Sequence, residues 1–150
     1  VIPSMPLNLA VFGVNAADSI IAAHPEITRW ALGGHSLGGS MAARYAQANP
    51  NTVQGLALLA SYPDIDLSTY ALDAVVVYGS NDGLATVEKV ESTRAFLPPT
   101  AQFIEIAGGN HAQFGWYGDQ SGDNPASIPR AEQQAQTINA VATLLARLGE

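Results

Sequence analysis

Residues 28–50 read TRWALGGHSLGGSMAARYAQANP and combine two structural patterns with a short motif between them. An apolar run predicts a strand over residues 28–33. Apolar side chains then recur at helical spacing over residues 37–48, and Asn49-Pro50 end that helix. Between the strand and the helix, Gly34-His35-Ser36-Leu37-Gly38 matches the pattern G-x-S-x-G. The stretch therefore predicts a strand, a tight turn that presents Ser36, and a helix.

The flanking sequence repeats this alternation of short apolar runs and helix-like spacing. Such alternation is typical of βαβ units, so we expect an α/β fold with a mostly parallel sheet and helices on both faces. Residues 1–3 resemble the end of a strand. The long segment 108–129 lacks periodicity and is expected to be a loop. Further strands are expected at 53–60, 74–78 and 103–106, and helices at 15–23, 86–96 with Thr86 as N-cap, and 130–148 with Ile138, Val141, Leu145 and Leu148 buried.

Composition limits the classes of function. The 150 residues are 47% hydrophobic and 13% charged, which suits a single domain over residues 1–150. Thirteen acidic against six basic residues give a formal net charge of -7, so we expect no nucleic-acid or membrane partner. The chain has no cysteine, which excludes disulfides and thiolate catalysis. The composition does not indicate a compartment.

Two residues of complementary chemistry follow later predicted strands. Asp82 comes after the strand at 74–78, and His111 comes after the strand at 103–106. The carboxyl ends of parallel strands share one edge of a sheet, so these side chains should meet Ser36 there. His111 would take the proton of Ser36 as a general base, and Asp82 would fix the imidazole tautomer. The order serine, aspartate, histidine agrees with the order known for this type of turn.

Alternatives exist for each member of the set. Gly34 to Gly38 could be a closely packed turn without catalysis. Asp64 and Asp66 also follow a predicted strand and are rival acids. Of the other histidines, His24 precedes a proline and is expected at a helix end. His35 adjoins the serine, where its ring should point away from the serine Oγ.

Side chains near the histidine suggest how a substrate could be held. Trp116 and Tyr117 could wall a substrate pocket together with His35, although surface or core packing of the two aromatic rings is an equal alternative. Asp119 and Asp123 raise the question of a metal. Their spacing matches no calcium loop, so we expect no metal and no cofactor.

Three segments resemble those of the α/β-hydrolase superfamily, in particular its small bacterial branch of dienelactone hydrolases and short-chain esterases. Residues 33–39 resemble the nucleophile elbow, 78–83 the acid loop and 108–115 the histidine loop. The resemblance implies a serine carboxylesterase-type hydrolase that cleaves a small ester through an acyl-enzyme on Ser36, with the Leu37 N–H in the oxyanion hole. A lipase or thioesterase relative and a non-catalytic binding or structural module are the alternatives.

The chain departs from this family at its N-terminal end. Family members usually place several strands before the elbow, whereas only 35 residues precede Ser36 here. The preceding strands normally supply the second oxyanion-hole amide, and without them a sheet edge is left unpaired. We expect an N-terminally truncated version of the fold. A fragment of a larger protein is the favoured explanation, and a naturally reduced hydrolase or a chain completed by a partner or a second copy are the others.

Overall fold

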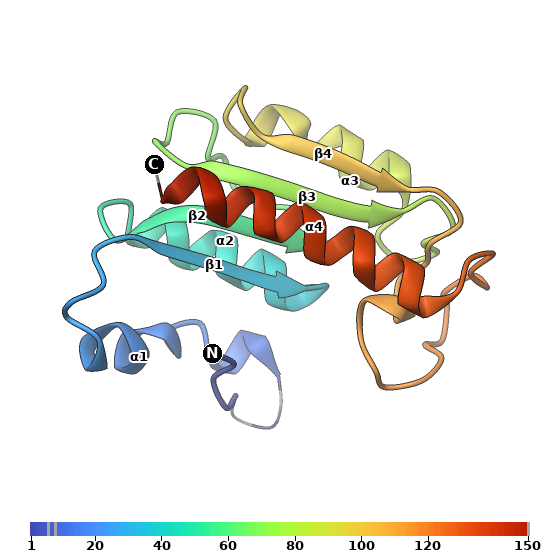
Figure 1. Ribbon diagram of the computed structural model, residues 1–150, viewed down its shortest axis with the longest axis horizontal. Helices are drawn as coiled ribbons and strands as arrows, with labels where there is room; N and C mark the ends of the chain where they lie inside the picture. Colours follow the sequence, from blue (N-terminus) through green and yellow to red (C-terminus); the bar gives the residue numbers. More distant parts are fainter. Residues whose placement is uncertain (6, 8, 150) are drawn as a thin grey trace.

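The computed structural model describes residues 1–5, 7 and 9–149. Its centre is a four-stranded sheet in which the strands follow one another in chain order. Every neighbouring pair is parallel, so the carboxyl ends of the strands share one edge (Figure 1). This confirms the predicted α/β class with a parallel sheet. The strands are β1 (Trp30–His35), β2 (Val53–Leu59), β3 (Asp73–Gly79) and β4 (Gln102–Ile106).

Helices cover both faces of the sheet, with α4 crossing in front of it and α2 and α3 behind it in Figure 1. Both α2 and α4 begin and end at the predicted residues. In the described part of the chain, no helix has the length and apolar character that crossing a membrane requires. The α-helices are α1 (Ala17–Ala23), α2 (Leu37–Ala48), α3 (Val87–Ser92) and α4 (Arg130–Leu148), and the short 3-10 turns are η2 (Ala10–Phe12), η3 (Arg94–Phe96) and η4 (Ala112–Phe114).

The core lies on the two central strands. In β3 the whole run 74–79 is buried, because both faces of the strand are covered by helices. This explains why it reads as an unbroken apolar segment, as buried parallel strands do. Leu144 of α4 and Val90 of α3 are both fully buried. Burial of each such side chain contributes about 1.5–3 kcal/mol before entropy losses.

The helix predicted over residues 86–96 is divided in two. Thr86 caps α3 as expected, since its Oγ1 accepts a hydrogen bond from the Lys89 N–H at 3.4 Å. At the other end, the Thr93 N–H and Oγ1 both donate to the Val90 carbonyl, at 3.1 and 2.8 Å. This short-range bonding competes with the α-helical pattern, so the last residues form η3 instead.

The buried stripe predicted for α4 is wrong at two of its four positions. Ile138 and Leu145 are 63% and 51% exposed, whereas Val141 and Leu148 are partly buried. Two of the inward positions are held by polar side chains, and these are hydrogen-bonded. A pattern based on hydrophobicity could not identify them. The buried residues of α4 are Gln133, Thr137, Ala140 and Leu144.

The N-terminal segment also differs from expectation. Residues 1–3 form no strand, and Val1 and Ile2 are 99% and 95% exposed. The reason is that β1 pairs with β2 alone among the described residues, so no neighbouring strand extends to this segment. Instead, α1 packs near α2, where the Tyr45 hydroxyl donates to Asp18 at 2.6 Å. A mostly apolar cavity of about 210 Å³ lies between these N-terminal turns, β1 and α2.

Candidate active site

Ser36 occupies the turn between β1 and α2 in a backbone conformation that non-glycine residues rarely adopt. Its φ of 54° and ψ of -128° cost a non-glycine residue about 1–3 kcal/mol. Three hydrogen bonds hold it there. Its N–H donates to the Leu59 carbonyl at 2.9 Å, and its carbonyl accepts from the Gly39 N–H at 3.0 Å and the Ser61 Oγ at 2.7 Å. The surrounding structure therefore imposes the strain on Ser36.

The glycines around the serine have different roles. A Cβ at Gly34 would overlap the backbone of Gly38 and Gly39, and a Cβ at Gly39 would overlap the side chain of Ser61. Strand and helix can therefore approach only because these two positions lack side chains. Gly38 does not serve this purpose, because a Cβ there would meet open space.

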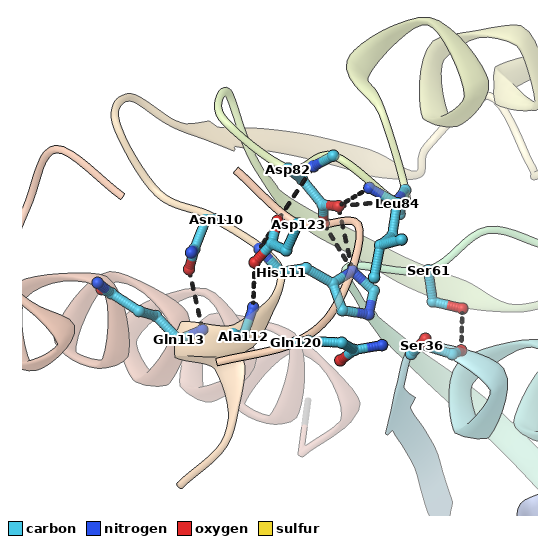
Figure 2. Close-up of polar contacts among 12 residues, drawn as sticks. Ser36, Ser61, Asp82, Leu84, Asn110, His111, Ala112, Gln113, Gln120 and Asp123 are labelled. Carbon is cyan, nitrogen blue, oxygen red and sulfur yellow. Dashed lines mark hydrogen bonds and ion pairs between the residues drawn. The ribbon is translucent and has the colours of Figure 1, made fainter. Parts of the chain in front are cut away.

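Asp82 and His111 form a buried pair at the same sheet edge (Figure 2). Asp82 is 4% exposed, and its Oδ1 accepts hydrogen bonds from the N–H groups of Leu84 and Ala85 at 2.8 and 2.7 Å. The Nδ1 atom of His111 lies 2.9 Å from Oδ2 and 3.1 Å from Oδ1. An ionised carboxylate only accepts, so Nδ1 carries the proton and Nε2 is left as a proton acceptor.

The imidazole of His111 lies between Asp82 and Ser36, with Nε2 on the Ser36 side (Figure 2). His111 is 1% exposed, and its Nε2 has no hydrogen-bond partner within the described residues. No hydrogen bond therefore joins the Ser36 Oγ to the His111 Nε2 in the described structure. Catalytic hydrogen bonds are often long in a substrate-free enzyme. The structure brings together the three residues that the sequence singled out.

The rival residues are engaged elsewhere. Asp64 forms an ion pair with Arg44 at 2.5 Å, and that hydrogen bond lowers the pKa of the Asp64 carboxyl. Asp66 accepts the Ser68 N–H at 2.8 Å. The side chain of His24 is 48% exposed. Within the described part of the molecule, none of the three side chains is hydrogen-bonded to Ser36, Asp82 or His111.

His35 lies against the histidine loop. Its ring centroid is 4.5 Å from that of His111, and it also contacts the rings of Phe114 and Tyr117 at 6.0 and 5.8 Å. Burial, and next the proximity of His111, lower the pKa of His35 to about 4. His35 is therefore neutral at pH 7 and places no positive charge beside His111. Its Nε2 is buried without a hydrogen-bond partner among the described residues.

The two adjacent aromatic residues lie in different surroundings. Tyr117 is 51% exposed, contacts the ring of His35, and donates its hydroxyl to Gln120 at 3.0 Å. Trp116 is 80% exposed and faces the Arg130 guanidinium, 4.9 Å from the ring centroid. Tyr117 thus lies next to the candidate site, whereas Trp116 faces solvent. A role for either in substrate binding stays a prediction.

Sequence reasoning missed the residue that holds the histidine loop to α4. Gln133 is fully buried, and its Oε1 accepts the Asn110 N–H at 3.0 Å while its Nε2 donates to the Asn110 carbonyl at 2.8 Å. Asn110 directly precedes His111, so this pair of bonds fixes the backbone next to His111. A glutamine in the first turn of an amphipathic helix gives no sequence signal of that role. Among the described residues, no group of three or more His, Cys, Asp or Glu side chains could hold a metal ion.

Comparison with known proteins relates the chain to hydrolases. A family model described as the alpha/beta hydrolase family matches residues 1–135. No match was found among curated protein sequences. Similar solved structures include an esterase from Thermogutta terrifontis, with a TM-score of 0.70, 13% identity, and coverage of 99% of this chain and 75% of the other.

Two further structures show the same fold. A structure from work on carboxylesterases of Nitrososphaera gargenis has a TM-score of 0.66 and 11% identity, covering 94% of this chain and 73% of the other. An alpha-beta serine hydrolase homologue from Coxiella burnetii has a TM-score of 0.64 and 17% identity, covering 90% and 60%. The chain therefore spans 60–75% of the length of these three proteins.

Proposed function

The chain belongs to the alpha/beta hydrolase family, and on that premise we propose that it is a serine hydrolase that cleaves small carboxylic esters through an acyl-enzyme on Ser36. The observation that carries the proposal is the buried pair of Asp82 and His111, whose free Nε2 faces a serine held at a φ of 54°. Backbone strain and a buried carboxylate are both costly. Their coincidence at one sheet edge favours catalysis over a purely structural turn.

The geometry supports a two-step acyl transfer. His111 Nε2 takes the Ser36 hydroxyl proton as Oγ attacks the ester carbonyl carbon, and the imidazolium then gives that proton to the departing alkoxide. The Asp82 carboxylate, held by two backbone N–H groups, stabilises the imidazolium and stays ionised. Water activated by the same Nε2 then attacks the acyl carbon and releases the acid and Ser36.

The start of α2 offers the first oxyanion donor. Leu37 is the first residue of the helix, so its N–H has no partner within it. The helix N-terminus also favours negative charge there. The Leu37 N–H is therefore the proposed donor, and each such donor contributes about 10²–10³ in rate. Tyr117 and His35 are the residues proposed to border the substrate.

The open edge of β1 supports a second part of the proposal. Within the described residues β1 pairs only with β2, and an unpaired strand edge invites a further strand. We propose that another segment of the same protein, or a second copy, pairs there and supplies the second oxyanion amide. Native mass spectrometry distinguishes the two sources: a dimer assigns the second copy, and an active monomer rules it out.

Labelling with a fluorophosphonate probe, read as intact mass, tests the proposed activity without a guess at the substrate. The native protein should gain a single adduct, and Ser36→Ala and heat-denatured protein should gain none. A protein shown to be folded by circular dichroism that forms no adduct would contradict an assembled active site in this chain. An adduct retained by Ser36→Ala would contradict the assignment of the nucleophile.

A further inference from the structure

The carboxylate of Asp123 collects backbone N–H groups from separate segments (Figure 2). Its Oδ1 accepts from Gly83 at 3.1 Å and from His111 at 3.2 Å, and its Oδ2 accepts from Ala112 at 2.9 Å. The N–H of Asn124, the next residue, also donates to Oδ1 at 2.9 Å. One side chain thus uses both oxygens to satisfy four backbone donors.

The donors belong to the two loops that carry the acid and the base. Gly83 directly follows Asp82, whereas His111 and Ala112 begin η4. The segment around Asp123 also packs directly on the acid loop, since a Cβ at Gly83 would overlap the carbonyl of Gly122. Asp123 therefore connects the backbone beside Asp82 to the backbone of His111, although it is not itself one of the proposed reacting residues.

We propose that Asp123 is a positioning residue that sets the separation of Asp82 and His111, an inference that rests on the proposed hydrolase function. The other direct connections between these two loops are the carboxylate–imidazole contact itself and two hydrogen bonds. The Asn81 N–H donates to the Gly109 carbonyl at 2.8 Å, and the Gly108 N–H donates to the Ser80 Oγ at 2.8 Å. Asp123 adds three bonds to that connection. It acts through the backbone and does not touch the reacting atoms.

The chemistry of the contact requires a carboxylate of this length. An ionised carboxylate only accepts, and its two oxygens have about four acceptor sites, which matches four N–H donors. Asparagine has the same shape, but its NH₂ group would replace one of the two accepting oxygens. That group would then face backbone N–H donors, with which it cannot form a hydrogen bond. Glutamate keeps the charge but moves the oxygens outward by one methylene. Both changes should weaken the connection between the two loops.

Asp123→Asn tests the proposal, with Asp119→Asn as the matched control. Asp119 is an exposed carboxylate in the same loop, so its replacement changes the net charge equally. We expect Asp123→Asn to lower kcat on a p-nitrophenyl acyl ester by about 10²-fold with little change in KM, as for a misplacement of about 1 Å. Asp119→Asn should retain the wild-type kcat.

A second measurement separates positioning from general stability. The proton between His111 Nδ1 and Asp82 should give a downfield proton resonance in the wild-type protein, and this resonance should be lost or broadened in Asp123→Asn. Thermal unfolding, followed by circular dichroism, shows whether each variant folds. If Asp123→Asn does not fold, Asp123→Glu takes its place, and the same loss of kcat and of the resonance is expected.

The outcomes are distinguishable from a failure of the proposed function. An Asp123 variant with wild-type kcat and an intact resonance overturns the inference, as does a loss of kcat that Asp119→Asn reproduces. A lower kcat with an intact resonance and a lower melting temperature assigns Asp123 a merely structural role and also overturns it. If the wild type neither labels nor hydrolyses the ester, the proposed function fails, and the resonance alone then decides the role of Asp123.

Discussion

The turn at Ser36 and the loop that carries His111 reach the same sheet edge but are held in place by different means. The turn is held mainly by backbone groups: glycines allow close approach, and two of its three hydrogen bonds are between backbone groups. The histidine loop is held by side chains distant in the sequence, Gln133 and Asp123. Local geometry can be recognised as a short motif, whereas support from distant side chains cannot.

Removing the proposed nucleophile should have the largest effect. Ser36→Ala is expected to lower kcat by about 10⁴- to 10⁶-fold, because the remaining residues cannot form an acyl-enzyme. Ser36→Gly should be equally inactive but more stable than Ser36→Ala by about 1 kcal/mol, since glycine adopts a positive φ without strain. Urea unfolding of the two variants measures this difference. Equal stabilities would contradict backbone strain at Ser36.

The support of the histidine loop comes next. Gln133→Leu removes both bonds to Asn110 and leaves a buried N–H and carbonyl unpaired, which should cost about 2–4 kcal/mol of unfolding free energy. Equilibrium denaturation provides the measurement. Ile138→Ala on the same helix is the control, and its exposed side chain should cost less than about 0.5 kcal/mol. A larger loss at Ile138 would mean that the predicted stripe, not the observed one, faces the sheet.

Two glycines of the turn offer a matched pair. Gly34→Ala places a Cβ against backbone and should cost about 1–3 kcal/mol of stability. Gly38→Ala places a Cβ in open space within a helix and should stabilise the protein by about 0.5–1 kcal/mol. Opposite signs in thermal or urea unfolding would confirm that only one of the two is needed for packing. Two losses of similar size would contradict it.

The smallest effect expected is on the pH dependence of stability. The pKa of His35 is lowered to about 4, so between that pH and 6.5 the unfolded chain binds more protons than the folded one. The contribution of neutral His35 to the free energy of unfolding is therefore complete above pH 6.5 and is lost as the pH falls toward 4. In His35→Asn, the decrease in unfolding free energy on acidification should be smaller than in the wild type by about 1 kcal/mol. This figure allows for the partial exposure of the ring. Unfolding free energies of both proteins at pH 8 and pH 4.5 provide the check.

Sequence reasoning succeeded where a pattern is local. The ends of α2 and α4 and the positions of Ser36, Asp82 and His111 on one edge all follow from motifs, strand order and periodicity. It failed where contacts with a residue distant in the sequence determine the local structure. The buried face of α4 is set by Gln133, and the segment 1–3 has no strand beside it within the described residues. For Asp123 the sequence raises only the question of a metal ligand, because the backbone donors that surround it have no signature in the sequence.

The strand order has a consequence for how the protein is made. Each strand pairs with the one that precedes it in the chain, so the sheet can be built in order as the polypeptide leaves the ribosome. Ser36 is synthesised early, whereas His111, Asp123 and Gln133 lie in the last third of the chain. We therefore expect the serine turn to form early in a nascent chain but to remain unreactive until α4 has emerged.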